Sequence, residues 1–221
     1  MKLWFSLKES LLGTAISSFY YWDSAHGILG LTPKILSSRS VEMPQKISTM
    51  ALVGTCSASA SHEDFFNDPK ERHEHQLVVE GIAQSLLPFG KLRIGEMELL
   101  KQPHLSHLMT SIEVFLDKIF DFESVVEAMH PTPALGAFPA VEGKKWLLEF
   151  QQHTPRRYYG APIGYHCGKT GRAHCVVAIR NVQWDSEGMF IGGGGGVVNE
   201  SVFEREWQEI QLKIGSILKL F

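Results

Sequence analysis

The sequence has little of what marks several common classes of protein. Only three of its 221 residues are cysteine, and none follows a C-x-x-C spacing, which argues against a disulfide scaffold and a thiolate zinc site. The formal net charge of −3 lacks the basic excess expected of a nucleic-acid-binding protein. No apolar run reaches the length of a membrane-spanning helix. We therefore expect a globular, cytoplasmic protein that binds neither nucleic acid nor membrane.

Two features qualify this expectation. The first 22 residues are partly apolar, but Lys8 and Glu9 interrupt them, so a helix leading into a strand is favoured over a signal peptide. We expect the cysteines to be reduced thiols. Cys167 and Cys175 flank a predicted turn and could face each other, which leaves a disulfide between them open.

The segment 160–171, GAPIGYHCGKTG, contains the Gly-Lys-Thr of a nucleotide-binding P-loop. That motif needs a glycine five residues before Gly168, where this chain has Ile163, and it needs a helix to follow. The chain instead continues with a β-branched run at 176–179, which is typical of a strand. We predict a hairpin turn at 168–171 and no nucleotide hydrolysis.

The histidines do not form a zinc motif. The residue four positions after His73 is Leu77, so the H-E-x-x-H pattern is missing. His73 and His75 would face different ways on a helix. His104 and His107 are three apart in a segment expected to be extended, and no cysteine cluster joins them. Zinc is not predicted.

The pattern of elements predicts an α+β protein. Strands are expected at 18–22, 26–31, 107–116, 189–191 and on both sides of the hairpin turn. Residues 37–49 show little periodicity and are expected to be loop or weak strand. Helices are expected from about 67 to 87, from 124, from Pro139 to about 152, and from Ser201.

The first helix has the clearest N-terminal signals. Asp68 can cap it, Pro69 suits its first position, and Glu71 completes a pattern like a capping box. Similar cap pairs are Ser124 with Glu127 and Ser201 with Glu204. The buried side of the first helix is predicted to carry Leu77, Val78, Ile82 and Leu86.

Two of these helices carry carboxylates spaced by three residues. Glu71 and Glu74 share one helix face, and Glu206 and Glu209 share another, together with Lys213. By spacing alone, such pairs are typical of ordinary solvated faces. Four carboxylates brought together would instead need a cation, and an all-oxygen set suits Mg²⁺.

Five consecutive glycines at 192–196 cost considerable backbone entropy on folding. Close approach of a ligand explains them better than a plain bend, and their amides could hold an anion. Arg180 and Tyr159 could contact a carboxylated ligand, although each alone is more typical of a surface charge or a core-edge aromatic.

Seven motifs in one order resemble the chorismate-binding enzymes, and isochorismate synthases most closely. They are KERHEH (70–75), HL (107–108), HPTPALGAFP (130–139), RRYYGAPIGY (156–165), VAIR (177–180), GGGGVV (193–198) and SVFEREWQEIQLK (201–213). The resemblance covers nearly the whole chain. It implies the C-terminal part of the anthranilate synthase component I-like fold, with β-sheets flanked by helices. Residues 1–221 would form a single chorismate-binding domain that lacks the family's N-terminal portion.

The resemblance also implies roles for particular residues. Glu74 and Glu209 would ligate Mg²⁺, which holds the ring carboxylate of chorismate, while Glu71 and Glu206 would support the ion through water. The substrate pocket would be lined by His107, Ala134, Tyr159, Arg180, Gly194, Gly196 and Lys213, with Arg180 and Tyr159 on the pyruvyl carboxylate. Relatives that eliminate pyruvate carry threonine at Ala134, so alanine favours simple conversion of chorismate to isochorismate.

In the family, a lysine base activates water at C2 and a glutamate acid protonates the departing C4 hydroxyl. Here the matching TEALAGT-like stretch reads TMALVGT, so Met50 stands at the acid position, and SPE reads TPK, with Lys34 in place of glutamate. Smaller departures are Ala137 and the order Gly160-Ala161. The base lysine of relatives lies in their N-terminal part, which this chain is not expected to contain.

Two hypotheses follow. The first is an isochorismate synthase-type enzyme with Mg²⁺. The second is a non-catalytic chorismate- and Mg²⁺-binding remnant, or the partner subunit of a split enzyme, with a protein partner or self-association covering the missing part. Met50 counts against the split enzyme, because a partner that brings the lysine would still have to replace the acid.

Overall fold

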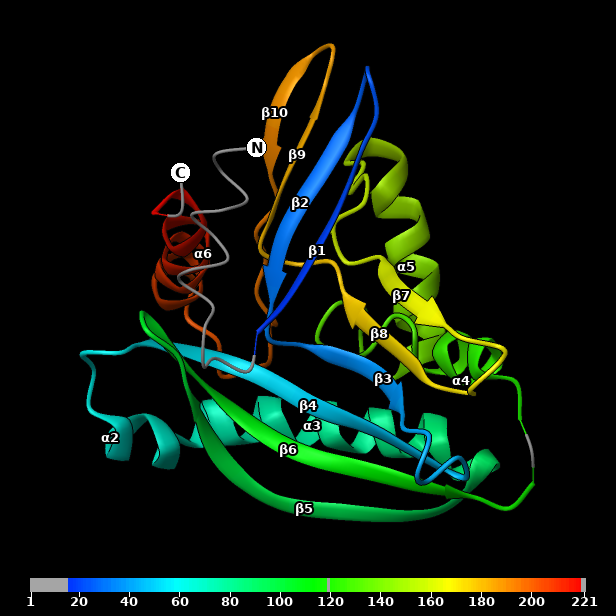
Figure 1. Cartoon of the computed structure of the whole chain (residues 1–221). Coiled ribbons are helices and arrows are strands. Elements are labelled where there is room, and N and C mark those ends of the chain that lie inside the picture. The colour runs from blue at the N-terminus through cyan, green and yellow to red at the C-terminus, as the bar shows by residue number, and fades with distance from the viewer. Residues whose placement is uncertain (1–15, 119, 220–221) are drawn as a thin grey trace.

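Two antiparallel sheets organise the computed structural model, which describes residues 16–118 and 120–219 (Figure 1). The four-stranded sheet has the order β1 (Ser17–Trp22), β2 (Gly27–Thr32), β9 (Asn181–Asp185) and β10 (Gly188–Ile191). The six-stranded sheet has the order β5 (Gly90–Lys101), β6 (Leu105–Leu116), β4 (Lys46–Ser57), β3 (Ile35–Arg39), β8 (Ala173–Val177) and β7 (Pro162–His166). The predicted α+β class is confirmed.

Five α-helices surround these sheets in the described part of the chain. They are α2 (His62–Asn67), α3 (Pro69–Leu86), α4 (Phe122–Met129), α5 (Ala140–His153) and α6 (Phe203–Leu218), and a short 3₁₀ turn, η1 (Leu87–Phe89), follows α3. None of the helices in residues 16–118 and 120–219 is long and apolar enough to cross a membrane. The helix predicted within the first 15 residues lies outside the described residues.

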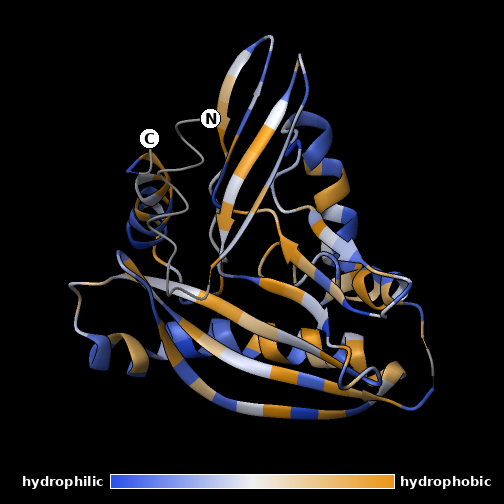
Figure 2. Cartoon of the chain, in the orientation of Figure 1, coloured by the Kyte–Doolittle hydropathy of each residue, from blue (hydrophilic) through white to orange (hydrophobic). Residues whose placement is uncertain are grey.

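The main core lies between α3 and one face of the six-stranded sheet. Val78, Ile82 and Leu86 are buried against Ile47 on β4 and Ile112 on β6. Leu77 of the predicted set is only half-buried. Figure 2 shows that the first half of α3 is hydrophilic and the second half more hydrophobic, so one helix serves two purposes. Its C-terminal half anchors the sheet, and its N-terminal half carries the acidic residues of the site described below.

The cap predictions are partly confirmed. The Asp68 side chain accepts hydrogen bonds from the backbone N–H groups of Lys70 and Glu71, so it caps α3 as expected. The reciprocal half of the capping box is missing, because the Asp68 N–H donates to the Phe65 carbonyl instead.

The other two cap predictions are wrong. Asp121 caps α4 by accepting from the Ser124 N–H, one turn before the predicted start. α6 begins after Val202 without a side-chain cap.

The prediction of loop or weak strand at 37–49 is confirmed, because the ends of two strands flank an irregular segment at 40–45. Residues 35–39 form β3 and residues 46–57 form β4. β3 buries the neighbouring residues Leu36 and Ser37, and β4 buries the polar Thr49, so burial here does not follow the apolar–polar alternation that marks a half-exposed strand. Leu36 and Ile47, for example, are almost fully buried in the main core.

The hairpin that resembled a P-loop is confirmed as a hairpin. β7 and β8 pair antiparallel, and the turn between them ends at Gly171, whose φ of +73° favours glycine. Cys175 lies opposite Gly164 rather than Cys167, and all three cysteines are free.

The two sheets share two crossing segments. Residues 32–35 lead from β2 to β3, and residues 177–181 lead from β8 to β9 (Figure 1). The crossings are hydrogen-bonded to each other, because the Val177 N–H donates to the Lys34 carbonyl over 3.1 Å and the Leu31 N–H donates to the Arg180 carbonyl over 3.1 Å. Arg180 adopts φ +51°, the left-handed conformation that lets β8 end and β9 begin in the other sheet.

Candidate functional site

A cavity lies where the two crossings, the ends of β4 and β6, the glycine run and α6 meet. Its lining contains all seven residues expected to bind substrate, namely His107, Ala134, Tyr159, Arg180, Gly194, Gly196 and Lys213. A wider groove shares Ala134, Tyr159 and the glycines with it and extends past Glu74, α5 and the loop at 133–138. Residues far apart in the sequence therefore converge on one site.

His107 and Arg180 form the most constrained contact of the cavity. An Arg180 Nη2–H donates to His107 Nε2, so His107 must be neutral and carry its proton on Nδ1. That Nδ1–H donates to the Gly54 carbonyl over 2.9 Å. Burial, helped by the Arg180 charge, lowers the pKa of His107 to about 3. His107 is thus fixed as a neutral residue that holds Arg180 in place.

Gly54 makes this contact possible. It lies at an irregularity in the pairing of β4 with β6, where its φ is +74°. Such a bulge needs glycine, and it turns the carbonyl of Gly54 out of the regular ladder toward His107. Arg180 is held at a second point, because its Nη1–H donates to the Gln102 Oε1 over 2.6 Å. Burial lowers the pKa of Arg180 to about 10, so the guanidinium keeps its charge at neutral pH.

The glycine run is packed against protein side chains on three sides. A β-carbon would lie 2.5 Å from the Tyr159 ring at Gly192, 2.8 Å from Ile214 at Gly193, and 2.1 Å from Glu74 Oε1 at Gly196. At Gly194, by contrast, the nearest atom would be the Tyr159 hydroxyl at 3.6 Å. The run therefore needs residues without a β-carbon so that neighbouring side chains can pack against its backbone. Only part of the run has room for a ligand.

The four predicted metal ligands come together. Glu71, Glu74, Glu206 and Glu209 are between 5% and 8% exposed. The solvated-face interpretation of these pairs is therefore wrong. Charges on Glu209 contribute to the raised pKa values of both Glu71 and Glu74, which places the two helices' carboxylates next to each other.

Lys70 sits among these carboxylates. Its Nζ is 2.7 Å from Glu206 Oε1, 2.9 Å from Glu74 Oε2 and 3.3 Å from Glu71 Oε1. Lys213 extends from α6, and its Nζ lies 2.6 Å from Glu209 Oε1 and 3.0 Å from the Gly194 carbonyl. Lys213 therefore joins the carboxylate cluster to the glycine run.

The cluster has the charge and the donors for a divalent cation. When all four carboxylates are ionised, they face two ammonium groups and two negative charges are left. The Oε2 atoms of Glu71 and Glu206 are buried and have no hydrogen-bond partner in the described part of the chain. Burial raises the pKa of Glu71 to about 7 against the opposing effect of Lys70, and it also raises that of Glu74. Oxygen donors with unmet negative charge fit Mg²⁺.

The two positions that depart from the family pattern lie in different places. Met50 is on β4 opposite Ser111, half-buried, and does not belong to the lining of the cavity. Lys34 lies on the first crossing, is 3% exposed, and lines the cavity. The departure that bears on the cavity is therefore Lys34.

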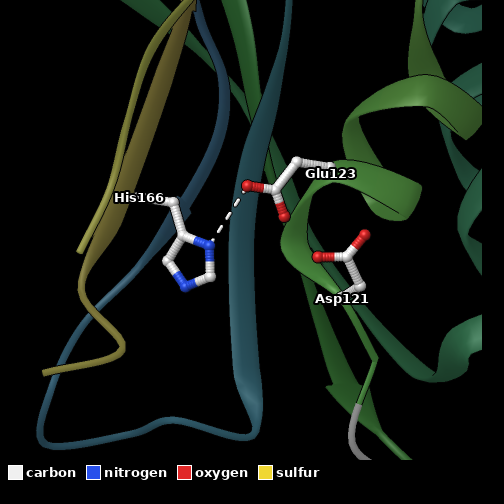
Figure 3. A group of neighbouring side chains, drawn as sticks. All are labelled: Asp121, Glu123 and His166. Atoms are coloured by element: carbon white, nitrogen blue, oxygen red, sulfur yellow. Dashed lines mark hydrogen bonds and ion pairs between the residues drawn. The ribbon is translucent and has the colours of Figure 1, made fainter. Parts of the chain in front are cut away.

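A second acidic group lies far from this site at the start of α4 (Figure 3). Asp121, Glu123 and His166 have ligand atoms within 4.8 Å of one another. However, an Arg39 Nη2–H donates to His166 Nε2 over 2.9 Å, so the other ring nitrogen carries the proton and bonds to Glu123. Asp121 is used as the helix cap. No lone pair of His166 is free for a metal ion. The three side chains are therefore accounted for by surface ion pairs and hydrogen bonds.

Comparison with known proteins agrees with this geometry. The family model described as "Chorismate binding enzyme" matches residues 10–221. The chain belongs to this family. It is 30% identical to the "Salicylate biosynthesis isochorismate synthase" of Pseudomonas aeruginosa over 178 residues. This stretch covers 76% of this chain and 37% of that protein. It is 28% identical over 212 residues to the isochorismate synthase MenF of Haemophilus influenzae, covering 92% of this chain and 48% of that protein.

Solved structures of the family share the fold. A 2,3-dihydroxybenzoate-specific isochorismate synthase of Bacillus anthracis, described as putative, superposes with a TM-score of 0.81 at 24% identity, over 97% of this chain and 60% of that one. The menaquinone-specific isochorismate synthase of Escherichia coli also gives 0.81 at 24% identity, over 97% of this chain and 51% of that one. This member of the family thus spans about half the length of the curated relatives it matches.

Sequence reasoning overlooked two lysines of the site. The motifs identify Lys34 as a departure without indicating a place in the pocket, and they indicate no role for Lys70, although it lies in KERHEH. Its spacing to Glu71 and Glu74, one and four residues, was the signal that could have found it. Lys34 had no comparable signal, because its contacts depend on how the two sheets meet.

Proposed function

We propose that this chain is an isochorismate synthase-type isomerase that converts chorismate to isochorismate with Mg²⁺. The observation that supports this most is the meeting of the seven pocket residues with a four-carboxylate cluster that carries two uncompensated negative charges. Chorismate carries two carboxylates. One fits Arg180, and the other fits a cation held beside the cavity. Relatives named isochorismate synthase, and alanine rather than threonine at Ala134, favour isomerisation over pyruvate elimination.

The residues that would hold Mg²⁺ are Glu74 and Glu209, with Glu71 and Glu206 in support. When bound, the ion would offset the charge of the substrate's ring carboxylate and position the ring. Arg180, held at Gln102 and His107, presents its guanidinium to the pyruvyl carboxylate with little freedom to lose on binding. Tyr159 lies against the glycine run and forms one wall of the same cavity.

A second candidate function is binding of chorismate and Mg²⁺ without turnover. The residue that favours it is Lys34, which puts an amine where relatives carry glutamate. In that case the chain would act as a binding remnant or as the partner subunit of a split enzyme.

Incubation of the purified protein with chorismate and MgCl₂, followed by chromatography, separates the two candidates. Isochorismate formed by the wild type and not by Glu209→Ala supports the isomerase. Calorimetric titration with MgCl₂ should also show weaker ion binding in Glu209→Ala. Unchanged Mg²⁺ binding in this variant would rule out the proposed metal site. Chorismate binding without product would favour the second candidate.

A further inference from the structure

Lys34 is built into the wall of the cavity. Its N–H donates to Thr32 Oγ1 over 3.2 Å, and its carbonyl accepts from the Val177 N–H over 3.1 Å, so the backbone of the crossing is held on both sides. Its side chain is almost completely buried and belongs to the cavity lining. A fixed backbone and a buried side chain that lines the cavity restrict the positions that Nζ can take.

The side chain of Lys34 has no partner within the described residues. No carboxylate oxygen there lies within 4.0 Å of its Nζ, and it makes no side-chain hydrogen bond. The other two lysines of the site differ in this respect, because Lys70 contacts three carboxylates and Lys213 contacts Glu209. A buried ammonium without a partner is costly, and a carboxylate that arrives beside it offsets part of that cost.

The charged groups around Lys34 come from several elements. Lys213 on α6 repels its ammonium form, and Glu74 on α3 attracts it, while burial has the largest effect and lowers the pKa of Lys34 to about 7. His75 and His107 also face it, and the pKa of each is lowered to about 4 and about 3, respectively. Both histidines are therefore neutral throughout the range in which Lys34 exchanges its proton.

We propose that Lys34 is a substrate-binding residue that takes up a proton from solvent when an anionic ligand with two carboxylates enters the cavity. The free protein then holds a large share of Lys34 as the neutral amine, and the complex holds it as an ammonium ion paired with a ligand carboxylate. The choice of chorismate as the ligand rests on the proposed function. The proton uptake rests on the burial and isolation of Lys34.

The consequence is an affinity that depends on pH. The complex binds more protons than the separated partners, so chorismate should bind more weakly as the pH rises above about 7. The loss approaches tenfold per pH unit, because one proton is linked to binding. The carboxylates of the ligand stay ionised over this range.

Calorimetric titration with chorismate at saturating MgCl₂ tests the proposal without need for turnover. At pH 7.5 the titration is repeated in phosphate and in Tris, whose ionisation enthalpies differ, so the change in apparent enthalpy gives the number of protons taken up. Because the pKa of Lys34 is lowered to about 7, the wild type should take up a large part of one proton at this pH. Lys34→Met should take up almost none.

Two further variants make the outcome specific. Lys34→Arg keeps the cation and cannot lose its proton at these pH values, so it should bind chorismate without proton uptake. Lys169→Met, at an exposed position in the β7–β8 turn, should behave like the wild type. Equal proton uptake in the wild type and in Lys34→Met would overturn the proposal. Uptake as expected with no isochorismate formed would refute the isomerase and leave the role of Lys34 standing. No chorismate binding by the wild type would overturn both.

Discussion

Lys70→Met gives the sharpest test of the acidic cluster. The substitution keeps the length and apolar stem of the side chain and removes one positive charge from contact with Glu71, Glu74 and Glu206. The side chain of Lys70 is 8% exposed, so water cannot replace the lost partner easily. The cluster would then carry three uncompensated negative charges instead of two.

The expected cost is large. Removal of one partner of a buried ion pair destabilises a protein by about 3–5 kcal/mol. For a chain of this size, that corresponds to a fall in the melting temperature of roughly 6–20 °C. The added negative charge should also strengthen binding of Mg²⁺, since the lysine and the ion serve the same carboxylates. An ion present at 100 times its Kd stabilises the folded state by about 2.7 kcal/mol, so Mg²⁺ should recover much of the loss.

Thermal and urea unfolding of the variant and the wild type, each with EDTA and with MgCl₂, measures both effects. Lys169→Met is the matched control, because it removes an exposed lysine and should change stability by less than about 0.5 kcal/mol. The reasoning is refuted if Lys70→Met unfolds within about 1 kcal/mol of the wild type in EDTA. It is equally refuted if Mg²⁺ stabilises the variant no more than the wild type.

Two other predictions concern the same cluster. Gly196→Ala should weaken Mg²⁺ binding, because the added β-carbon would lie 2.1 Å from Glu74 Oε1. Gly194→Ala has room for a β-carbon and should leave Mg²⁺ binding unchanged. Calorimetric titration of both variants with MgCl₂ checks this, and equal affinities would contradict the prediction. In metal-free buffer, Glu71 has a folded-state pKa of about 7, above its ordinary value of 4.5. The unfolded chain therefore loses that proton first, and stability should fall as the pH rises from about 4.5 to about 7. Glu71→Gln should flatten this part of the profile, and an unchanged slope in urea unfolding would show that another group is responsible.

Local signals in the sequence were sufficient for much of the fold. Asp68 and Pro69 marked the start of α3, and Pro139 marked that of α5, because caps and proline act through neighbouring backbone groups alone. The same reasoning left loop and weak strand open at 37–49. The strands there depend on pairing with β8 and β6 and on the burial of Leu36 and Ile47 in the main core, and the local sequence does not record these distant contacts.

The candidate site shows the same division. The helix period alone predicts that the two glutamates of each pair share a helix face. It does not predict that the pairs on α3 and α6 meet, because that depends on the path of the glycine run, which passes beside Glu74 before α6 begins. Only the ordered set of motifs brought the pairs together at the level of sequence. Lys34 could not be placed in the pocket, because its position depends on the crossing between two sheets.

The two crossings have a consequence for the motions of the protein. Lys34 follows the last strand residue of β2 by two positions, Arg180 immediately precedes β9, and Gly192 immediately follows β10, so the cavity is built on the base of the four-stranded sheet. Any opening that detaches this sheet from the six-stranded one dismantles the cavity at the same time. A bound ligand should therefore slow amide hydrogen exchange in β2 and β9 well beyond the residues it touches, because exchange there requires the ligand to leave first.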